Sequence, residues 1–263
     1  LQDEWKFAKN WELTMGIRYD HYSDFGSTFN PRAALVWNVN EEFTHKLMYG
    51  KAFRAPNFTE LGSQNNPAFK GNKDLNPETI HTLEWAMDFH PSPVFRTALN
   101  LYFYEIERLI SVIPNLGFRN SGHQNGYGSE LEWNWQINNQ VNLTGNYAWQ
   151  NARNEQTERR IEGVPEHHFY IAAAWQFLPQ WQFQSQLNVI ASRISAPEDK
   201  RPLNDYQTLD FTLRGKKLFE HINIIASLRN ALDTTYREPA AIGFAENLPM
   251  PGRSFYLEAA INF

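Results

Sequence analysis

Residues 253–263 read RSFYLEAAINF, and every second side chain of this stretch is apolar. The odd-numbered positions from Phe255 to Phe263 form one apolar face, whereas the even-numbered positions are polar or amphipathic, apart from the small Ala260. A period of two places alternate side chains on opposite faces of a β-strand. A strand that closes a barrel in a lipid bilayer has to face hydrocarbon on one side, which gives a terminal aromatic residue a reason to be there. The stretch therefore predicts a transmembrane β-strand.

The same alternation recurs along the whole chain, in runs of about ten residues, which is the length a strand needs to cross a bilayer at the tilt of a barrel. In one run, Leu131, Trp133 and Trp135 alternate with polar residues. We predict thirteen strands, at residues 2–8, 11–20, 32–39, 43–53, 79–90, 94–106, 124–136, 141–151, 167–177, 181–192, 206–215, 222–229 and 253–263.

The composition agrees with a membrane barrel. Hydrophobic residues make up 42% of the 263 residues, yet the mean hydropathy is −0.57, because half of each barrel strand faces a polar lumen. No apolar stretch approaches the length of about 18 residues that marks a membrane-spanning helix. Aromatic residues reach 15%, which suits the interfacial girdles of a barrel. The alternative is an aromatic-rich soluble protein, such as a carbohydrate-binding β-sandwich.

Charge and cysteine content exclude several kinds of function. The chain has no cysteine, so we expect no disulfide, thiol nucleophile or thiolate metal site. The net charge is −5 and no long basic run occurs, which argues against nucleic acid as a partner. Residues 1–5 read as the interior of a strand and not as a signal peptide, so we expect sequence upstream of Leu1 to be missing.

The connections between the predicted strands alternate strictly between short and long. Outer-membrane barrels have short periplasmic turns and long external loops, whereas a β-sandwich has no reason to sort its loops in this way. Short connections lie at residues 8–10, 38–42, 90–93, 137–140, 178–180 and 216–221, and long ones at 21–31, 54–78, 107–123, 152–166, 193–205 and 230–252. We therefore expect residues 1–263 to form one antiparallel barrel sheet without linkers or a second domain.

The number of predicted strands has a consequence for the whole barrel. Thirteen is odd, so the first and last strands run in the same direction and antiparallel closure fails, whereas bacterial single-chain barrels are even-stranded. The parity fits the C-terminal part of a 22-stranded barrel, the class with a plugged lumen. The alternative is an error of one strand, which would give a complete 12- or 14-stranded barrel.

Four local motifs stand at the ends of predicted strands. Pro56 lacks an amide donor and ends strand pairing after Arg54, and Pro77 biases the residue before it toward an extended conformation. Asn230 and Asp233 can form side-chain turns where a strand ends. The four motifs read FRAP at 53–56, NKDLNPET at 72–79, LRNALDTTY at 228–236 and PGRSFY at 251–256.

This set of motifs, in this order, resembles the C-terminal barrel of TonB-dependent outer-membrane receptors, and the resemblance covers essentially the whole chain. It implies active import of a scarce chelate, often a ferric siderophore, by a multi-pass protein of the outer membrane. It also implies an N-terminal plug in the lumen, which an inner-membrane complex pulls through TonB, and both the plug and its TonB-contacting segment are absent from this sequence. Phe263 looks like the residue that the barrel assembly machinery recognises in this family. Lipid and lipopolysaccharide are further expected partners. We expect no bound cofactor. The alternative cargo is cobalamin or another large nutrient.

An anionic ferric chelate favours basic side chains on the external loops and the upper wall. The alternative is that charged loop residues are solvated or bind lipopolysaccharide phosphate, and acidic residues in the same loops dilute a basic funnel. The candidate ligand-binding residues are Arg54, Arg108, Arg119, His123, Arg153 and Arg193, with Lys70, Lys73, Arg159, Arg160, Lys200 and Arg201 as further basic loop positions.

Other chemistries find less support. Haem is disfavoured because residues 57–71, where haem receptors of this family typically carry a ligating histidine, contain none. His167 and His168 are adjacent and would face opposite sides of a strand, so we expect no metal site there. Ser121 and His123 lack an identifiable third partner for a catalytic triad, so we do not expect an enzyme, although some outer-membrane barrels are hydrolases. A passive porin is the remaining alternative.

Overall fold

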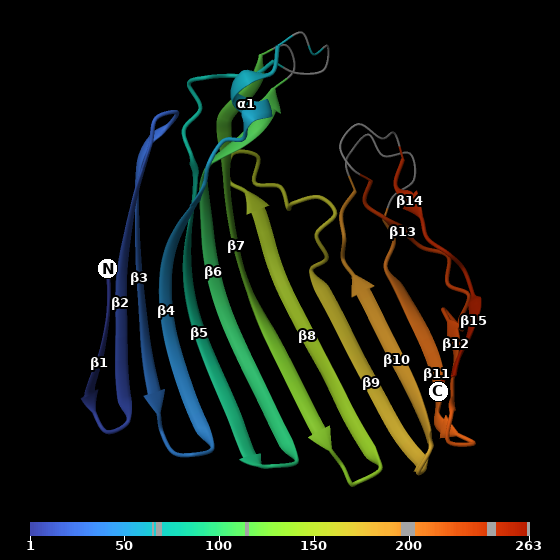
Figure 1. Ribbon diagram of the computed structural model, residues 1–263. Coiled ribbons are helices and arrows are strands. Elements are labelled where there is room, and N and C mark those ends of the chain that lie inside the picture. Colours follow the sequence, from blue (N-terminus) through green and yellow to red (C-terminus); the bar gives the residue numbers. More distant parts are fainter. Residues whose placement is uncertain (65, 67–69, 114–115, 196–202, 241–245, 262–263) are drawn as a thin grey trace. The chain divides into compact units, whose positions relative to one another are not determined.

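The computed structural model describes residues 1–64, 66, 70–113, 116–195, 203–240 and 246–261. Thirteen strands follow one another in chain order in a single antiparallel sheet (Figure 1). This confirms the predicted fold class and strand number. The strands are β1 Gln2–Ala8, β2 Trp11–Tyr22, β3 Gly26–Asn38, β4 Phe43–Arg54, β5 Glu78–Ser92, β6 Phe95–Ile113, β7 Gly117–Gln136, β8 Val141–Asn154, β9 His167–Leu178, β10 Trp181–Ala191, β11 Tyr206–Leu218, β12 Ile222–Arg229 and β15 Ser254–Ile261.

The chain divides into two compact units. The first unit comprises Leu1–Asp88, Asn100–Ser129 and Asn151–Ile161, and the second comprises Phe89–Leu99, Glu130–Gln150 and Glu162–Phe263.

In the first unit, the register keeps apolar and polar residues on separate faces. Paired residues of neighbouring strands share a face of the sheet. β2 pairs with β3 so that Trp11 lies opposite Trp37 on the apolar face, whereas Gly16 lies opposite Arg32 on the other face. The period of two read from the sequence therefore persists across the strands.

In the second unit, the same separation holds. Gln186 of β10 pairs with Asp210 of β11 on the polar face, and Leu187 pairs with Leu209 on the apolar face. β12 and β15 continue this pattern, because the odd-numbered residues of β15 pair with Leu228, Ala226, Ile224 and Ile222 of β12.

The sheet has no conventional core. Among the described residues, no large side chain is less than 2% exposed. Large apolar side chains remain open instead, for example Trp5 at 61%, Tyr19 at 65% and Leu257 at 68% exposure. So much open apolar surface requires an apolar environment outside the chain. Within the described residues, no helix combines the length and the apolar character needed to span a membrane.

The first unit contains two groups of contacting aromatic rings, one near the short turns and the other near the opposite ends of its strands. At the turn end, stacked neighbours have ring centroids 5.1 to 5.5 Å apart; these are Trp11, Trp37, His45 and Trp85. At the opposite end, the rings of Tyr22, Phe25 and Phe53 lie 4.5 to 6.3 Å apart. Two such groups are the arrangement expected of girdles at the two membrane surfaces. Arg54 follows Phe53 and therefore lies beyond the outer group.

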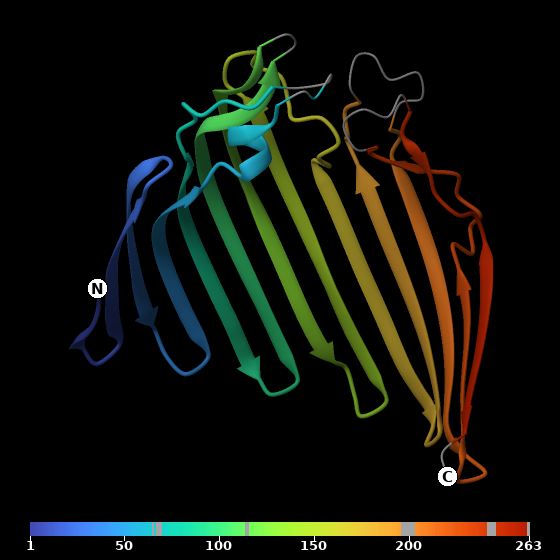
Figure 2. The ribbon, with the colours of Figure 1, turned by 45° about the horizontal axis from the view of Figure 1, so that its top comes forward.

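The prediction that long and short connections alternate strictly is wrong in two places. The predicted loop 21–31 is a tight turn, because β2 extends to Tyr22 and β3 begins at Gly26, as Figure 2 shows. The predicted loop 107–123 is mostly strand, because β6 extends to Ile113 and β7 begins at Gly117. Beyond the apolar band both faces of a strand meet water, so the apolar alternation ends in the sequence although strand pairing continues.

The loops also contain elements that the sequence reading missed. Helix α1, Phe58–Gly62, lies between β4 and β5. The short strands β13, Arg237–Glu238, and β14, Leu248–Pro249, pair with each other between β12 and β15. The predicted assembly signal Phe263 lies outside the described residues.

Candidate functional site in the external loops

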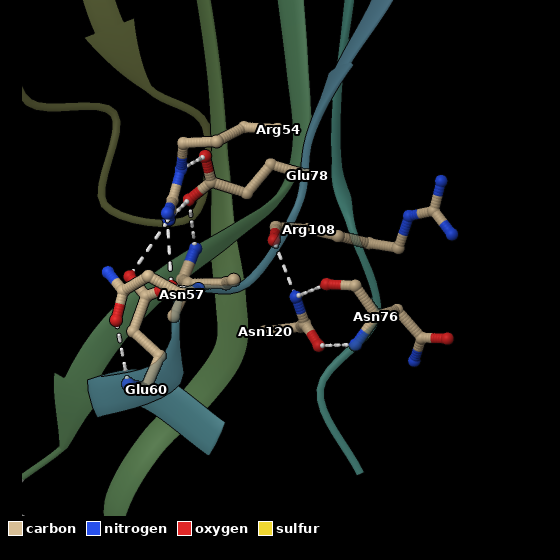
Figure 3. A network of polar contacts seen from close by, with 8 residues as sticks. Arg54, Asn57, Glu60, Asn76, Glu78, Arg108 and Asn120 are labelled. Atoms are coloured by element: carbon tan, nitrogen blue, oxygen red, sulfur yellow. Dashed lines mark hydrogen bonds and ion pairs between the residues drawn. The ribbon is translucent and has the colours of Figure 1, made fainter. Parts of the chain in front are cut away.

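Arg54 of the first motif contacts two carboxylates, Glu78 of the second motif and Glu60 of α1 (Figure 3). Its Nε donates to Glu78 Oε2 at 2.5 Å and its Nη2 to Glu78 Oε1 at 2.8 Å. Its Nη1 and Nη2 also donate to the two carboxylate oxygens of Glu60 at 3.0 and 3.1 Å. The carboxylate side chains are only 10% and 11% exposed, whereas Arg54 is 45% exposed. The cluster carries one net negative charge, and both of its carboxylates depend on one guanidinium.

Glu60 is held in place by the first turn of α1. Asn57 is the N-cap residue, and its Oδ1 accepts a hydrogen bond from the Glu60 amide at 2.9 Å. In return, Glu60 Oε2 accepts one from the Asn57 amide at 2.8 Å. This reciprocal capping box satisfies two amides that have no partner within the helix and fixes the carboxylate that Arg54 contacts.

The Arg54–Glu78 pair lies beyond the membrane-spanning segments, because Arg54 follows the outer aromatic group. Burial raises the pKa of the Glu78 carboxyl. The hydrogen bonds from Arg54 and from the Ile110 amide, which lies 2.6 Å from Oε1, lower that pKa by more, so it ends below its ordinary value. Hydrogen bonds to Glu78 and then Glu60 raise the pKa of the Arg54 guanidinium.

The β4–β5 loop is attached to the outer end of the β6–β7 hairpin. The Phe118 amide donates to the Lys70 carbonyl at 3.0 Å, and Asn72 Nδ2 donates to the Phe118 carbonyl at 3.2 Å. The Asn72 amide donates to the Glu60 carbonyl at 2.8 Å, which connects the same segment to α1. Accordingly, α1 lies beside β6 and β7 in both ribbon views.

Gly117 permits this attachment. Its φ is +77°, a left-handed backbone conformation that residues other than glycine rarely adopt. A Cβ atom at this position would lie 2.1 Å from the Lys70 carbonyl oxygen. The loop can approach the hairpin only because residue 117 has no side chain.

Asn120 makes the second connection between the loop and the hairpin. Its Oδ1 accepts from the Asn76 amide, and its Nδ2 donates to the carbonyls of Asn76 and Arg108, each at 2.8 Å (Figure 3). Arg108 has a φ of +57° and its Nη2 donates to Thr79 Oγ1 at 3.3 Å. One amide group thus fixes both the second motif and a predicted ligand residue.

The structure places three more predicted residues in the first unit. Arg119 Nη1 donates to the Phe118 carbonyl at 2.9 Å. The His123 carbonyl accepts from the Glu155 amide at 3.0 Å. Arg153 Nε donates to Asn151 Oδ1 at 3.0 Å. None of these three side chains has a carboxylate partner among the described residues.

Arg193 belongs to the second unit and is buried. Its side chain is 2% exposed, and its Nη1 lies 3.0 Å from Glu238 Oε2. Its Nη2 donates to the carbonyls of Asn204 and Arg237, and its guanidinium lies 5.0 Å from the centre of the Tyr206 ring. Arg193 therefore holds β13 against the ends of β10 and β11.

The third and fourth motifs meet at Asn230. Its side chain accepts from the Thr234 amide at 2.9 Å and donates to the Thr234 carbonyl at 2.8 Å, while Asp233 Oδ1 accepts from the Arg253 amide at 2.8 Å. Both Asn230 and Asp233 have positive φ angles. The contacts between Asn230 and Thr234 confirm the side-chain turn predicted at Asn230. The predicted turn at Asp233 is not seen, because its carboxylate bonds to Arg253, 20 residues further on, and thereby directs the chain into β15.

The residues weighed for catalysis or metal binding have ordinary polar partners. Ser121 Oγ lies 2.6 Å from Ser111 Oγ. His167 Nδ1 lies 2.8 Å from the Tyr147 hydroxyl, whereas His168 Nε2 lies 2.7 Å from Asn188 Oδ1. In the part of the chain that the structure describes, no group of three or more His, Cys, Asp or Glu residues could hold a metal ion.

Two residues of this site were missed by sequence reasoning. Glu60 carries a readable signal, because residues 57–60 match the spacing of a capping box. Asn120 carries none, because its partners lie 44 and 12 residues away in the chain.

The chain is similar to known outer-membrane proteins in sequence and in fold. The iron-regulated outer membrane virulence protein of Vibrio cholerae is 24% identical over the whole of this chain, which covers 44% of that protein. The vitamin B12 transporter BtuB of Vibrio cholerae is 33% identical over 41% of this chain and 16% of its own length. The ferric-catecholate import receptor Fiu of E. coli K12 has the same fold, with a TM-score of 0.81 at 17% identity over the whole chain and 44% of its own.

The chain thus spans less than half the length of the relatives it matches. The family model described as "TonB dependent receptor-like, beta-barrel" matches residues 1–231. The chain therefore belongs to the β-barrel domain of the TonB-dependent receptors, a family of outer-membrane receptors and transporters and not of enzymes.

Proposed function

We propose that the full-length protein imports a ferric siderophore or a similar metal chelate across the outer membrane, energised through TonB. The observation that carries this proposal is the similarity of the whole chain to an iron-regulated outer-membrane protein. A fold shared with a ferric-catecholate import receptor supports it.

We also propose a division of labour within that protein. This chain contributes part of the wall of a 22-stranded barrel together with external loops, and a plug outside this chain fills the lumen and contacts TonB. The outward apolar faces contact lipid and lipopolysaccharide, and Phe263 directs assembly of the barrel into the membrane. The polar face with Gln186 and Asp210 supports a lumen that contacts water or a polar plug.

For ligand binding, we propose different roles for the predicted residues. Arg108, Arg119, His123 and Arg153 meet the anionic chelate, since none of these side chains is occupied by a carboxylate among the described residues. Arg54 and Arg193 act indirectly, because carboxylates and carbonyls already occupy their guanidinium groups. A chelate with several anionic oxygens suits planar guanidinium donors on adjacent loops.

Cobalamin is the second candidate cargo. The observation that favours it is the 33% identity to a vitamin B12 transporter over 107 residues. That similarity covers 41% of this chain, whereas the similarity to the iron-regulated protein covers all of it, so we rank the iron chelate first.

The test is growth of a receptor deletion strain complemented with the full-length gene. The panel contains ferric tricatecholate, ferric trihydroxamate and ferric citrate as iron sources, and cobalamin in a strain that requires it. We expect growth on at least one ferric chelate to depend on the receptor and to stop when the proton gradient is collapsed. Dependence of cobalamin use alone would overturn the iron assignment, and uptake that persists without the gradient would point to a passive pore.

A further inference from the structure

The side-chain amide of Asn120 forms the hydrogen bonds that a backbone peptide group would form. It exchanges two hydrogen bonds with the backbone of Asn76, as a neighbouring strand would, and uses its second amide hydrogen on the Arg108 carbonyl. All three bonds are 2.8 Å long, which is a favourable length for N–H···O bonds. Asn120 therefore joins three segments: the second motif, β6 and β7.

Arg108 needs such support because its backbone is strained. Its φ of +57° lies in the left-handed region, which costs free energy for any residue with a side chain. Such a conformation persists only where the surroundings fix it, and strained residues of this kind gather at ligand-binding positions. The carbonyl of this same residue is the one that Asn120 holds.

The left-handed backbone conformation of Arg108 sets the direction in which its side chain leaves the strand. In Figure 3 its side chain extends away from the cluster of Arg54, Glu60 and Glu78. Its described partner is the Thr79 hydroxyl, a neutral group at 3.3 Å, so its positive charge is not neutralised by that contact. A return to an extended backbone would turn this side chain in another direction.

We infer that Asn120 is a positioning residue for ligand recognition, which fixes the backbone of Arg108 so that its guanidinium is presented to an anionic metal chelate. This inference rests on the proposed function. Asn120 itself does not contact the chelate, because its amide is already used by Asn76 and Arg108.

The chemistry of this position favours asparagine. Aspartate has the same length but no amide hydrogens, so it would lose both bonds to carbonyls and would place its charge against them. Glutamine is one methylene longer and cannot keep the same three partners without moving the backbone. Alanine removes all three bonds and leaves the loop attached through Asn72 and Lys70.

The test is a double-mutant cycle in the full-length receptor on whole cells, with radioactive iron as the complexes of a tricatecholate, a trihydroxamate and citrate. We expect Asn120→Ala to weaken binding of the recognised chelate about tenfold, in line with the loss of hydrogen bonds that orient a charged group. Arg108→Ala should weaken it at least as much. The double variant should bind no worse than Arg108→Ala, because Asn120 acts only through Arg108.

Asn125→Ala is the matched control, since Asn125 lies on the same strand and its side chain donates to Glu155 at 2.8 Å. We expect it to change the affinity less than about twofold, as for a surface polar contact. Heat-modifiable mobility on gels reports whether each barrel is assembled. If Asn120→Ala does not assemble, Asn120→Ser is measured in the same cycle, with a smaller loss expected.

The outcomes separate this inference from the proposed function. A wild-type receptor that binds none of the three complexes would overturn the proposed function, and the inference with it. A wild-type receptor that binds, combined with an unchanged affinity for Asn120→Ala, would overturn the inference alone. Losses for Asn120→Ala and Arg108→Ala that add in the double variant would do the same.

Discussion

Replacing Arg54 by methionine removes the guanidinium that both buried carboxylates share and keeps a side chain of similar length. Glu60 and Glu78 then remain 10% and 11% exposed with no cation between them. Breaking a buried ion pair from one side costs about 3 to 5 kcal/mol, because the remaining charge is left uncompensated. Arg54 is itself 45% exposed, so solvent screening reduces the expected cost to about 2 to 3 kcal/mol.

This cost should appear as local opening and not as loss of the barrel. The cluster holds α1 and the β4–β5 loop of the first unit, so the expected effect is confined to the segments that its hydrogen bonds join. A cost of about 2 to 3 kcal/mol corresponds to an opening equilibrium that is about 30 to 150 times more favourable. Backbone amides that depend on the closed loop, such as those of Leu61, Ser63 and Asn72, should therefore exchange faster by that factor.

Hydrogen exchange of the full-length receptor in detergent measures this directly. Peptides from α1 should exchange faster in Arg54→Met, whereas peptides from β10 and β11 should not change. The triple variant Arg54→Met, Glu60→Gln, Glu78→Gln is the control, because it removes the unpaired charges and keeps acceptors for the Asn57 and Ile110 amides. It should recover most of the protection. Unchanged exchange in Arg54→Met would show that the guanidinium does not hold the loop closed, and equally fast exchange in the triple variant would show that unpaired charge is not the cause of opening.

Three further predictions concern loops of the two units. The folded-state pKa of Glu78 lies below its ordinary value of 4.5, so its carboxylate stabilises the closed loop above that pH. Protection of α1 from hydrogen exchange, corrected for intrinsic rates, should be constant from pH 7 to about 5 and should fall as the pH passes through the lowered pKa. Equal protection at pH 3 and pH 7 would contradict this prediction. Gly117→Ala should loosen the loop and speed exchange of α1, because it adds left-handed strain of about 1 to 2 kcal/mol and a close contact with the Lys70 carbonyl. Gly26→Ala is the control, since it has comparable strain but open space around its Cβ, and it should leave exchange of α1 unchanged. Glu238→Gln should leave the buried Arg193 cation without its carboxylate, at a cost of about 2 kcal/mol, and the Arg237–Glu238 peptide should therefore exchange faster. Glu41→Gln in an exposed turn is the control. Equal exchange of this peptide in the two variants would rule out that Glu238 holds β13 through Arg193.

The strands could be predicted because the bilayer imposes a strong and simple rule on them. Each transmembrane run has to alternate, and pairs such as Trp11 with Trp37 or Leu187 with Leu209 show that the alternation read in one dimension is also the register in three. The rule stops at the membrane surface. Residues 107–113 and 117–123 were therefore assigned to a loop although they continue β6 and β7.

The candidate site could be predicted only in part. Arg54 and the second motif were recognised as strand-end features, but nothing local shows that Glu60 and Glu78 share one guanidinium, because the three residues are 6 to 24 positions apart. Arg108 and Arg193 look alike in the sequence as basic residues near strand ends. Their difference arises from loop packing, which buries Arg193 against Glu238 and leaves Arg108 with a neutral hydroxyl.

We expect these strands to cross the outer membrane with the α1 loop outside the cell and the short turns in the periplasm. The most direct measurement is labelling of single cysteines with a membrane-impermeant maleimide on intact cells, since residues 1–263 contain no cysteine and the unsubstituted full-length protein gives the background. Thr59→Cys in α1 should be labelled on intact cells, whereas Asn40→Cys and Asn138→Cys in the short turns should react only after the outer membrane is permeabilised. Labelling of the turn positions on intact cells, with Thr59→Cys protected until permeabilisation, would show that the α1 loop lies on the periplasmic side and would overturn this topology.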